Sequence, residues 1–404
     1  MSSPDPTAPH YPVVRLIPKA NARAIRHGFP WAYANEVVTD RRTRALPAGT
    51  IAELQDAERS PMGLVAVNPN SKIFCRMLTR DTSARIDRTW LTARLQAAQD
   101  HRARLFADPF YRLVHAEADG LAGVVIDRFG DTAVVQPNAA WADVLFDDLA
   151  AALVDVTGVS CVIKNASGRA RSLEGLDDIT QVAIGSAPGI VAVPMNGAIY
   201  MADLLEGQKT GLFFDQRPNH AFAQQLANGG QVLDVFSHVG GFSLAMLAGG
   251  ATGALAVDSA APALELAAKG AAAMGRSDAL ATRRGDAFDV LTALAGEGAQ
   301  FDVVVCDPPA FAPAKPALDR GLRAYERLAR LAAPLVKPGG YLGLCSCSHA
   351  ADLTRFRAAC NAGIGKAGRH AQIVHTGFAG PDHPLMPGLA ESGYLKALFY
   401  RLMA

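Results

Sequence analysis

The sequence is poor in cysteine, in long apolar runs and in net charge. Its 404 residues include 6 cysteines, too few and too unevenly spread for the disulfide framework of a secreted domain. The opening residues MSSPDPTAPHYP are polar and proline-rich, unlike a secretory signal, and no uncharged apolar run approaches the roughly 20 residues of a spanning helix. The chain has 39 basic and 38 acidic residues, which argues against a polycation that coats nucleic acid with its whole surface. Local basic patches are still compatible with this balance. We expect a soluble, cytoplasmic protein without a membrane partner.

Apolar residues are plentiful by contrast. Half of the residues are hydrophobic and only 19% are charged, which favours buried cores and excludes general disorder. The length suits roughly two to four domains of about 100–200 residues each. No internal repeat is evident. The pair Cys345 and Cys347 has no second ligand pair at a suitable interval, so we expect no metal site.

Three blocks with different patterns follow a polar tail, residues 1–12, which we expect to be disordered. Short apolar runs separated by Pro, Gly and Asn predict a small β-rich domain over 13–86, with strands at 13–17, 49–55 and 63–69. An α+β domain is expected over 87–188, beginning with an amphipathic helix at 87–106. Its other elements are expected at 111–117, 123–130, 131–137 and 161–165 (strands) and 141–154 (helix). A β-hairpin linker over 189–211 turns at Asn196-Gly197.

The last block, 212–404, alternates strands with helices. We expect strands at 231–236, 253–258, 280–287, 301–307 and 339–347, and helices at 243–250, 260–275, 287–298 and 323–336. This alternation predicts an α/β domain of the Rossmann-like class, with an open, mainly parallel sheet and helices on both faces.

Acidic residues lie at or near the ends of successive strands of this block. Asp234 precedes a loop with Gly240 and Gly241, Asp258 ends the next strand, and Asp286 and Asp307 lie at the ends of later ones. Parallel sheets bind ligands at the carboxyl ends of their strands. The loop lacks the G-x-G-x-x-G of dinucleotide sites. Carboxylates suit the sulfonium and amino groups of S-adenosylmethionine, and Asp258 and Asp286 can accept from its ribose and adenine.

Five sequence runs together resemble the large-subunit rRNA methyltransferase I family. They are GQKTGLFFDQR (207–217), DVFSHVGGFS (234–243), CDPPAF (306–311), KPGGYLGLCSCS (337–348) and DHP (382–384); GFPWAY, PAGT and EADGLAGVVIDRFG match as well. The resemblance covers about 13–403. It implies a PUA-like domain, a central EEHEE-type domain and a C-terminal class I methyltransferase domain that acts on carbon 5 of a cytidine in 23S rRNA. Ala310 stands where the family often has Lys, and His238 where it often has Tyr.

Methylation at carbon 5 of cytosine calls for a cysteine nucleophile, because a thiolate on carbon 6 makes carbon 5 reactive. The resemblance assigns this role to Cys347. Strand alternation places Cys345 on the same face, while Cys306 is expected to pack in the core; an inert thiol remains the alternative for each. Asp307 is expected to hold the base and stabilise charge, with a turn-forming role as its alternative.

The predicted site residues form two further sets. The cofactor set is Asp234, Phe236, Gly240, Gly241, Phe242, Asp258, Ser259, Asp286, Ala287, Asp307 and Pro308. The RNA-binding set is Arg15, Lys19, Arg23 and Arg26 in the first domain, with Lys164, Arg169 and Arg171 in the second. A solvated charged face is the alternative for the first of these patches.

Two other functions stay open. An S-adenosylmethionine-dependent enzyme could instead methylate a base nitrogen (guanine N7 or an exocyclic amine), since Asp-Pro-Pro followed by an aromatic residue also occurs in amino methyltransferases. A non-catalytic RNA-binding assembly factor is the second alternative. A homodimer is compatible with the sequence, which fixes neither the oligomeric state nor the target nucleotide.

Overall fold

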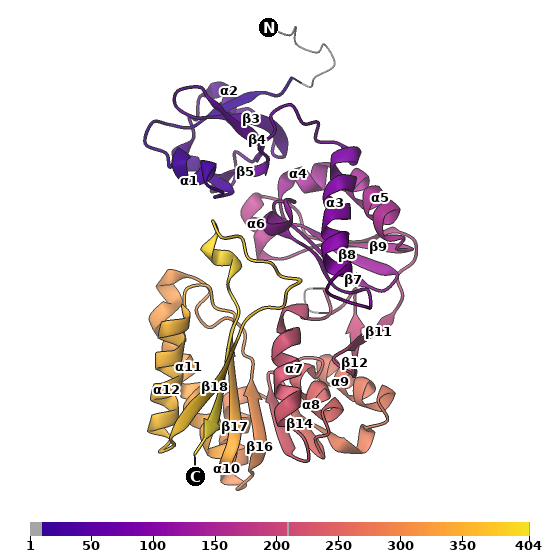
Figure 1. The fold of residues 1–404 in the computed structure, drawn as a ribbon, viewed down its shortest axis with the longest axis vertical. Helices are drawn as coiled ribbons and strands as arrows, with labels where there is room; N and C mark the ends of the chain where they lie inside the picture. The colour runs from indigo at the N-terminus through magenta and orange to yellow at the C-terminus, as the bar shows by residue number, and fades with distance from the viewer. Residues whose placement is uncertain (1–9, 208–209, 404) are drawn as a thin grey trace. The chain divides into compact units, whose positions relative to one another are not determined.

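The computed structural model describes residues 10–207 and 210–403, which divide into two compact units (Figure 1). The first unit runs up to Gly189 and also contains Asp382–Ser392; the second contains Ile190–Pro381 and the residues from Gly393 onward. No helix within the described ranges is long and apolar enough to cross a membrane.

The first domain of unit 1 is a five-stranded sheet in the order β1-β3-β4-β5-β2. Its elements are β1 (Val13–Arg15), α1 (Ala22–Arg26), β2 (Trp31–Tyr33), α2 (Arg41–Arg44), β3 (Thr50–Gln55), β4 (Pro61–Val67) and β5 (Ile73–Thr79). The three expected strands are present, whereas β2 and β5 were not predicted. Most of the predicted tail lies outside the described residues, but Tyr11 packs against the apolar cluster that is formed mainly by the second domain, and its hydroxyl accepts a hydrogen bond from the amide of Ile86.

The second domain of unit 1 packs helices against a five-stranded sheet in the order β10-β9-β8-β7-β6. Its elements are α3 (Arg88–Ala103), β6 (Phe110–His115), β7 (Val124–Phe129), β8 (Thr132–Pro137), α4 (Ala140–Val144), α5 (Phe146–Thr157), β9 (Cys161–Ala166), α6 (Arg169–Glu174) and β10 (Ile179–Ile184). The four expected strands are confirmed. The single helix expected at 141–154 is two helices that meet at Leu145, and β10 was missed.

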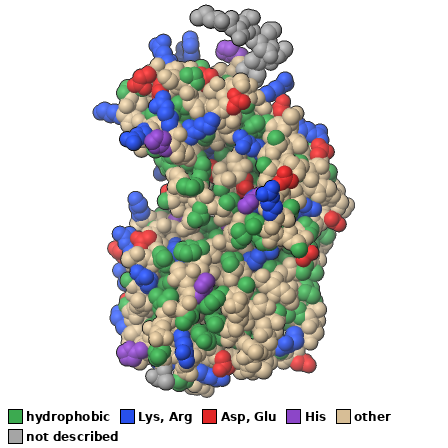
Figure 2. Space-filling model, in the orientation of Figure 1, with side chains coloured by type: hydrophobic (Ala, Val, Ile, Leu, Met, Phe, Trp, Pro, Cys, Tyr) green, Lys and Arg blue, Asp and Glu red, His purple; other side chains and the backbone are tan. Residues whose placement is uncertain are grey.

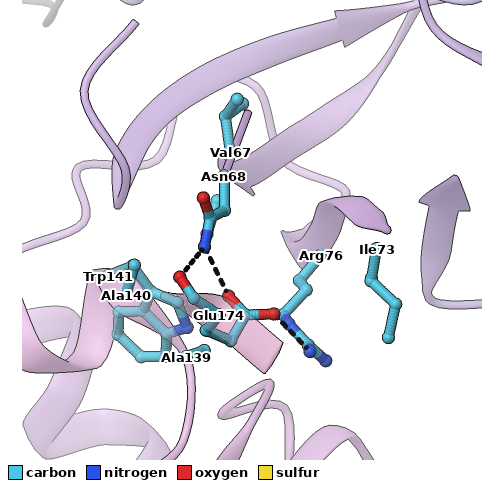
Figure 3. A pocket seen from close by; sticks show the side chains of 9 residues that line it. Val67, Asn68, Ile73, Arg76, Ala139, Ala140, Trp141 and Glu174 are labelled. Carbon is cyan, nitrogen blue, oxygen red and sulfur yellow. Dashed lines mark hydrogen bonds and ion pairs between the residues drawn. The ribbon is translucent and has the colours of Figure 1, made fainter. Parts of the chain in front are cut away.

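A buried carboxylate joins the two domains of unit 1. Glu174 is only 3% exposed. Its side chain accepts hydrogen bonds from Asn68, Ser71 and Arg76, each at 2.9 Å. Figure 3 shows Asn68 and Arg76 converging on Glu174 at the edge of a small pocket beside Trp141. Because every partner of this carboxylate comes from the first domain, the cluster fastens one domain to the other.

Unit 2 begins with the hairpin β11 (Ile190–Met195) and β12 (Ala198–Asp203). Asn196 and Gly197 form its turn with φ angles of 53° and 73°, as the sequence predicted. β12 packs on two helices of the last domain, α8 (Gly241–Ala248) and α9 (Ala261–Ala273). The hairpin that the sequence predicted within 189–211 is present, and it is part of the second compact unit.

The core of unit 2 is a seven-stranded sheet in the order β15-β14-β13-β16-β17-β19-β18. The strands are β13 (Gln231–Val235), β14 (Gly253–Asp258), β15 (Leu280–Arg284), β16 (Phe301–Cys306), β17 (Val336–Ser346), β18 (Ala371–Gly377) and β19 (Lys396–Leu402). β13 to β17 pair in parallel, while β19 is antiparallel to both of its neighbours. The predicted parallel sheet is confirmed, and β18 and β19 were not foreseen.

Helices cover both faces of this sheet (Figure 1). They are α7 (Arg217–Leu226), α8 (Gly241–Ala248), α9 (Ala261–Ala273), α10 (Ala287–Gly296), α11 (Leu318–Ala332) and α12 (Leu353–Lys366). α10, α11 and α12 share one apolar core with the sheet, and α7, α8 and α9 pack next to one another along the chain order. The central strands are buried on both sides, which explains their nearly continuous apolar sequences.

The range 212–404 implied a continuous final domain, but the structure interrupts it. Asp382–Ser392 returns to unit 1, where Arg102 donates to the carbonyl of Asp382 at 2.9 Å and the amide of Arg112 donates to its carboxylate at 3.1 Å. His383 lies 3.0 Å from the same carboxylate. Because Arg102 is fully buried and also pairs with Asp119, the DHP motif has a structural role in the second domain.

Candidate active site

The loop that connects β13 to α8 forms one wall of the candidate site. Phe236 and His238 have φ angles of 64° and 49°, and Gly240 has 85°. Positive φ costs energy for residues other than glycine and is concentrated at functional sites. At Gly240, an added Cβ would also lie 3.0 Å from the side chains of Ala267 and Leu244. The loop therefore depends on the glycine that the sequence analysis singled out.

Asp234 fixes the beginning of α8. Its Oδ2 accepts hydrogen bonds from the amides of Phe242 (3.1 Å) and Ser243 (2.8 Å). The side chain is fully buried, and this burial, reinforced by the charge of Asp258, raises the pKa of Asp234 to about 7 despite the two amide hydrogen bonds. A buried carboxylate of this kind is stabilised by a cation beside it.

Asp258 lies at the end of β14, and backbone amides orient both of its carboxylate oxygens. Its Oδ2 accepts from the amide of His238 and its Oδ1 from the amide of Ala260, each at 2.9 Å. Each oxygen retains a second lone pair. A half-buried carboxylate held in this way can accept from two adjacent hydroxyl groups, such as those of a ribose.

Asp286 and its neighbours lie at the next strand end. The Oδ1 of Asp286 caps α10 by accepting from the amides of Phe288 (2.9 Å) and Asp289 (3.2 Å), so only Oδ2 is left for a ligand. Ala287 is buried beneath it, and the carbonyl of Ser259 accepts a hydrogen bond from Arg284. The cofactor contact predicted for Phe242 stays a prediction; its ring is 2% exposed and lies 4.5 Å from that of His220, and its amide donates to Asp234.

Three buried polar atoms in and beside this loop, Asp234 Oδ1, Ser237 Oγ and Ser243 Oγ, make no hydrogen bond of normal geometry among the described residues, although the Ser243 hydroxyl lowers the pKa of Asp234. Native proteins rarely leave such atoms unsatisfied, and a ligand is one explanation. Together with Asp258 and Asp286 they provide carboxylates and hydroxyls, whereas a pyrophosphate is bound by positive charge and amides. These side chains fit S-adenosylmethionine, because its amino and sulfonium groups carry positive charge that carboxylates stabilise.

Asp307 and Cys347 lie at the ends of two adjacent strands. β16 ends at Cys306 and β17 at Ser346, and Cys306 pairs in register with Leu344. The amide of Asp307 donates to the carbonyl of Val235 at 3.1 Å, which joins this strand end to β13. The structure thus brings Asp307 and Cys347 to the same edge of the sheet as Asp234. Pro308 is buried directly after Asp307.

A buried chain of hydroxyl groups holds the backbone on both sides of Cys347. The hydroxyl of Ser346 donates to the Tyr325 hydroxyl at 2.8 Å, and the Tyr325 and Ser348 hydroxyls lie 2.7 Å apart. The Ser348 hydroxyl also accepts from the amide of Ala312 at 2.9 Å. Both serines are fully buried. The Ser-Cys-Ser run is therefore anchored at its two serines, with the cysteine between them.

The thiols near this edge differ in burial. Cys306 and Cys345 are fully buried, and burial, with Asp307 adding to it, raises the pKa of the Cys345 thiol well above its ordinary value. Burial raises the pKa of Cys306 too. Cys347 is partly exposed, the only one of the six cysteines, all described, that is not buried. The expectation that Cys306 packs in the core is confirmed.

Two supporting residues escaped the sequence analysis. Tyr325 comes from α11, and burial raises its pKa to about 12, so its hydroxyl stays protonated. Lys396 is the first residue of β19, is 4% exposed and donates to the carbonyl of Ser348 at 2.7 Å. The only signal for either was membership of an amphipathic helix or an apolar run, neither of which indicates a site.

The segment before α7 also borders the site. The ring of Phe213 lies 5.1 Å from that of His238, and the buried Asp215 accepts from the hydroxyl of Tyr394 at 2.6 Å. Gln216 is buried too; its Oε1 accepts from Asn219 at 2.6 Å, and its side chain counteracts the rise in the pKa of the Cys345 thiol. Gln208 and Lys209, part of the same sequence run, lie outside the described residues.

The predicted basic patch of the first domain is only partly open to solvent. Lys19 and Arg23 are exposed. Arg26 is 48% exposed and pairs with Asp56, and Arg15 is half-buried. A second basic group, Arg41, Arg42 and Arg44, lies on α2 and was not predicted as a contact. Figure 2 shows several Lys and Arg side chains on the visible face of this domain.

The second predicted patch is largely closed, which corrects the prediction for Arg171. This residue is 1% exposed and donates to the carbonyls of Pro137 and Asp177, while its guanidinium pairs with Asp143. Lys164 pairs with the same carboxylate at 2.7 Å, with 13% of its side chain exposed. Among the three, Arg169 alone is exposed. α6 turns Arg171 inward, where it serves packing.

Comparisons with known proteins agree with this geometry. Residues 182–401 match the S-adenosylmethionine-dependent methyltransferase family, and residues 14–80 match a PUA-like domain. Two solved structures, a SAM-dependent methyltransferase from Streptococcus mutans and a methyltransferase complexed with SAH, share the fold. Each has a TM-score of 0.81 over 96% of this chain, at 19% and 20% identity, and is covered over 100% and 99% of its own length.

Full-length relatives show the family. A ribosomal RNA large subunit methyltransferase from Deinococcus radiodurans is 33% identical, with 100% of both chains covered. A ribosomal RNA large subunit methyltransferase I from Alteromonas mediterranea is also 33% identical, with 95% of this chain and 97% of the relative covered. The chain therefore belongs to the ribosomal RNA large subunit methyltransferase I family and is an S-adenosylmethionine-dependent methyltransferase with a PUA-like domain.

Proposed function

We propose that this protein methylates carbon 5 of a cytidine in 23S rRNA through a covalent bond between Cys347 and the base. The observation that carries the proposal is the placement of Cys347, a partly exposed thiol between two anchored serines, at the sheet edge that also holds Asp307. The names of the full-length relatives supply the rRNA substrate class.

The chemistry follows from what a cytosine requires. The Cys347 thiolate adds to carbon 6, and the electron pair of the 5,6 double bond becomes available at carbon 5. Asp307 accepts a hydrogen bond from the base and stabilises the charge that develops as the thiolate adds. S-adenosylmethionine, when bound, supplies the methyl group. A proton acceptor then removes the hydrogen of carbon 5 as a proton, the 5,6 double bond of the cytosine re-forms, and the Cys347 thiolate leaves carbon 6.

RNA would be held by the first domain. Between residues 14 and 80 the chain has 11 basic and 5 acidic residues, and Lys19, Arg23 and the arginines of α2 are exposed. Such side chains bind phosphates and give affinity without sequence information. The target base must leave its stack to reach a thiol inside the site. A cytoplasmic location and a homodimer stay predictions.

Trapping tests the covalent step. Target RNA that contains 5-fluorocytidine should form a stable complex with the protein in the presence of S-adenosylmethionine, because fluorine cannot leave as a proton. Cys345→Ala is the matched control and should still trap the RNA, whereas Cys347→Ala should not. Absence of a complex, together with methylated guanine N7 or an exocyclic amine in the product nucleosides, would replace this proposal with nitrogen methylation. Calorimetry that detects no S-adenosylmethionine binding would favour a non-catalytic assembly factor.

A further inference from the structure

Lys396 is a buried lysine at the carboxyl edge of the sheet, and none of the steps proposed above uses it. It is 4% exposed, and no ion pair joins it to a carboxylate among the described residues. Burying a lysine without such a partner is costly and is often a mark of function. Its ammonium instead donates to the carbonyl of Ser348 at 2.7 Å, the residue directly after Cys347.

The position of Lys396 is fixed by strand pairing. In the antiparallel pair of β17 and β19, Lys396 lies opposite Ser346, the residue directly before Cys347. The Lys396 side chain thus contacts the residue after Cys347, while the Lys396 backbone pairs with the residue before Cys347. The hydroxyl chain through Tyr325 holds the same segment from α11.

The charges around this lysine favour an ammonium at neutral pH. Burial lowers the pKa of Lys396 to about 8, and the charges of Cys347 and Asp352 oppose that shift. Such coupling is mutual: an ammonium that is favoured by a thiolate favours the thiolate in turn. The remaining titratable groups nearby are Tyr325, which stays neutral, Asp307, whose charge acts on the adjacent Cys345, and His349, which packs on Tyr394.

We propose that Lys396 is a positioning residue for the methyl transfer, whose ammonium stabilises the thiolate of Cys347 and holds the Ser348 carbonyl so that the sulfur faces the base. The proposal rests on the proposed role of Cys347 as nucleophile. No atom is transferred to or from Lys396; its contribution is charge and orientation.

Alkylation of Cys347 by iodoacetamide as a function of pH tests this without RNA or turnover. The other five cysteines are buried, so the modified Cys347 peptide can be followed by mass spectrometry, with Cys347→Ala as the blank. In Lys396→Gln, which keeps an N–H donor and loses the charge, the midpoint of the profile should rise by about one pH unit or more. Lys396→Arg should restore the midpoint to near that of the unaltered protein.

Two controls separate the possible failures. S-adenosylmethionine affinity should stay the same in all variants, which reports an intact fold. If Lys396→Gln does not fold, Lys396→Met, with an apolar side chain suited to the buried position, carries the same test. An unchanged midpoint in a folded neutral variant overturns the role of Lys396. Full methyl transfer by Cys347→Ala would instead overturn the proposed nucleophile, whatever the alkylation profile of Lys396→Gln.

Discussion

The carboxyl edge of the seven-stranded sheet has two halves that are built differently. Around β13, β14 and β15, the carboxylates assigned to the cofactor are held by backbone amides, as Asp234 is by Phe242 and Ser243 and Asp258 by His238. Around β16 and β17, the segment of the proposed nucleophile is held by the side chains of Tyr325 and Lys396, which come from α11 and β19. The first half therefore depends on backbone amides of one continuous stretch of chain, and the second on side chains that other elements of the domain supply.

This difference has a functional reading. A cofactor that the same family uses throughout can be bound by a compact local motif, whereas a nucleophile needs its neighbours fixed from several directions. Variants in the two halves should consequently fail in different assays: cofactor affinity for the first, and chemistry without loss of cofactor affinity for the second.

The sharpest test of the division is Cys347→Ala. If the thiolate attacks carbon 6, methyl transfer to RNA should fall by at least about 1,000-fold, because the covalent route has no substitute. S-adenosylmethionine affinity should change by less than about twofold. Transfer of labelled methyl groups and calorimetry measure the two quantities. Cys345→Ala, two residues away and fully buried, is the control, and robust turnover by folded Cys347→Ala would refute the covalent mechanism.

Asp258→Ala tests the cofactor half. Loss of charge-assisted hydrogen bonds to the ribose should weaken S-adenosylmethionine binding by about 1–3 kcal/mol, or roughly 5- to 150-fold. Asp258→Asn removes the charge but keeps an oxygen that can accept from one of the two amides, His238 or Ala260, so it separates the loss of charge from the loss of the whole side chain. Unchanged calorimetric affinity in a folded Asp258→Ala would remove this carboxylate from the site.

The same two halves show how far sequence alone reaches. Asp234, Asp258 and Asp286 lie at or just after the ends of successive strands, so their position at one edge could be predicted from the parallel topology. Lys396 could not be predicted as part of the site, because the pairing of β19 with β17 depends on a register that no local pattern encodes. Long-range pairing also hid the return of Asp382–Ser392 to unit 1. Arg171 was misjudged because α6 is too short for its buried face to stand out.

A pH titration of cofactor binding tests the electrostatics of Asp234. Burial raises the pKa of this carboxyl to about 7 in the folded protein, above its usual value of about 4 in an unfolded chain. It therefore contributes stability that is present below pH 4 and is lost as the pH rises through 7. Binding of a cation favours the ionised form, so affinity should rise up to tenfold per pH unit below 7 and level off above it.

Asp234→Asn is the control for this titration, since it keeps the size of the side chain and removes its proton equilibrium. The affinity of this variant should vary little between pH 5.5 and 8.5, on the order of twofold or less. If the unaltered protein shows an equally flat profile, the carboxyl does not titrate in this range, which contradicts the raised pKa of Asp234.

The smallest expected effect concerns the first domain, where Lys19 and Arg23 are exposed on the predicted basic patch. Changing both to Gln should weaken RNA binding by about 2- to 10-fold at low salt and reduce the slope of log affinity against log salt by nearly two, because each lost phosphate contact releases about one counterion fewer. Cofactor affinity should not change, since no residue of this patch belongs to unit 2.

Lys366→Gln provides a matched control. This exposed lysine pairs with Glu326 on unit 2 and lies outside the PUA-like domain, so its loss should leave the slope of log affinity against log salt as it is. If filter binding at four or five salt concentrations gives the same slope for the double variant and for Lys366→Gln, the patch is a solvated surface, and the arginines of α2 become the remaining candidates for the phosphate contacts.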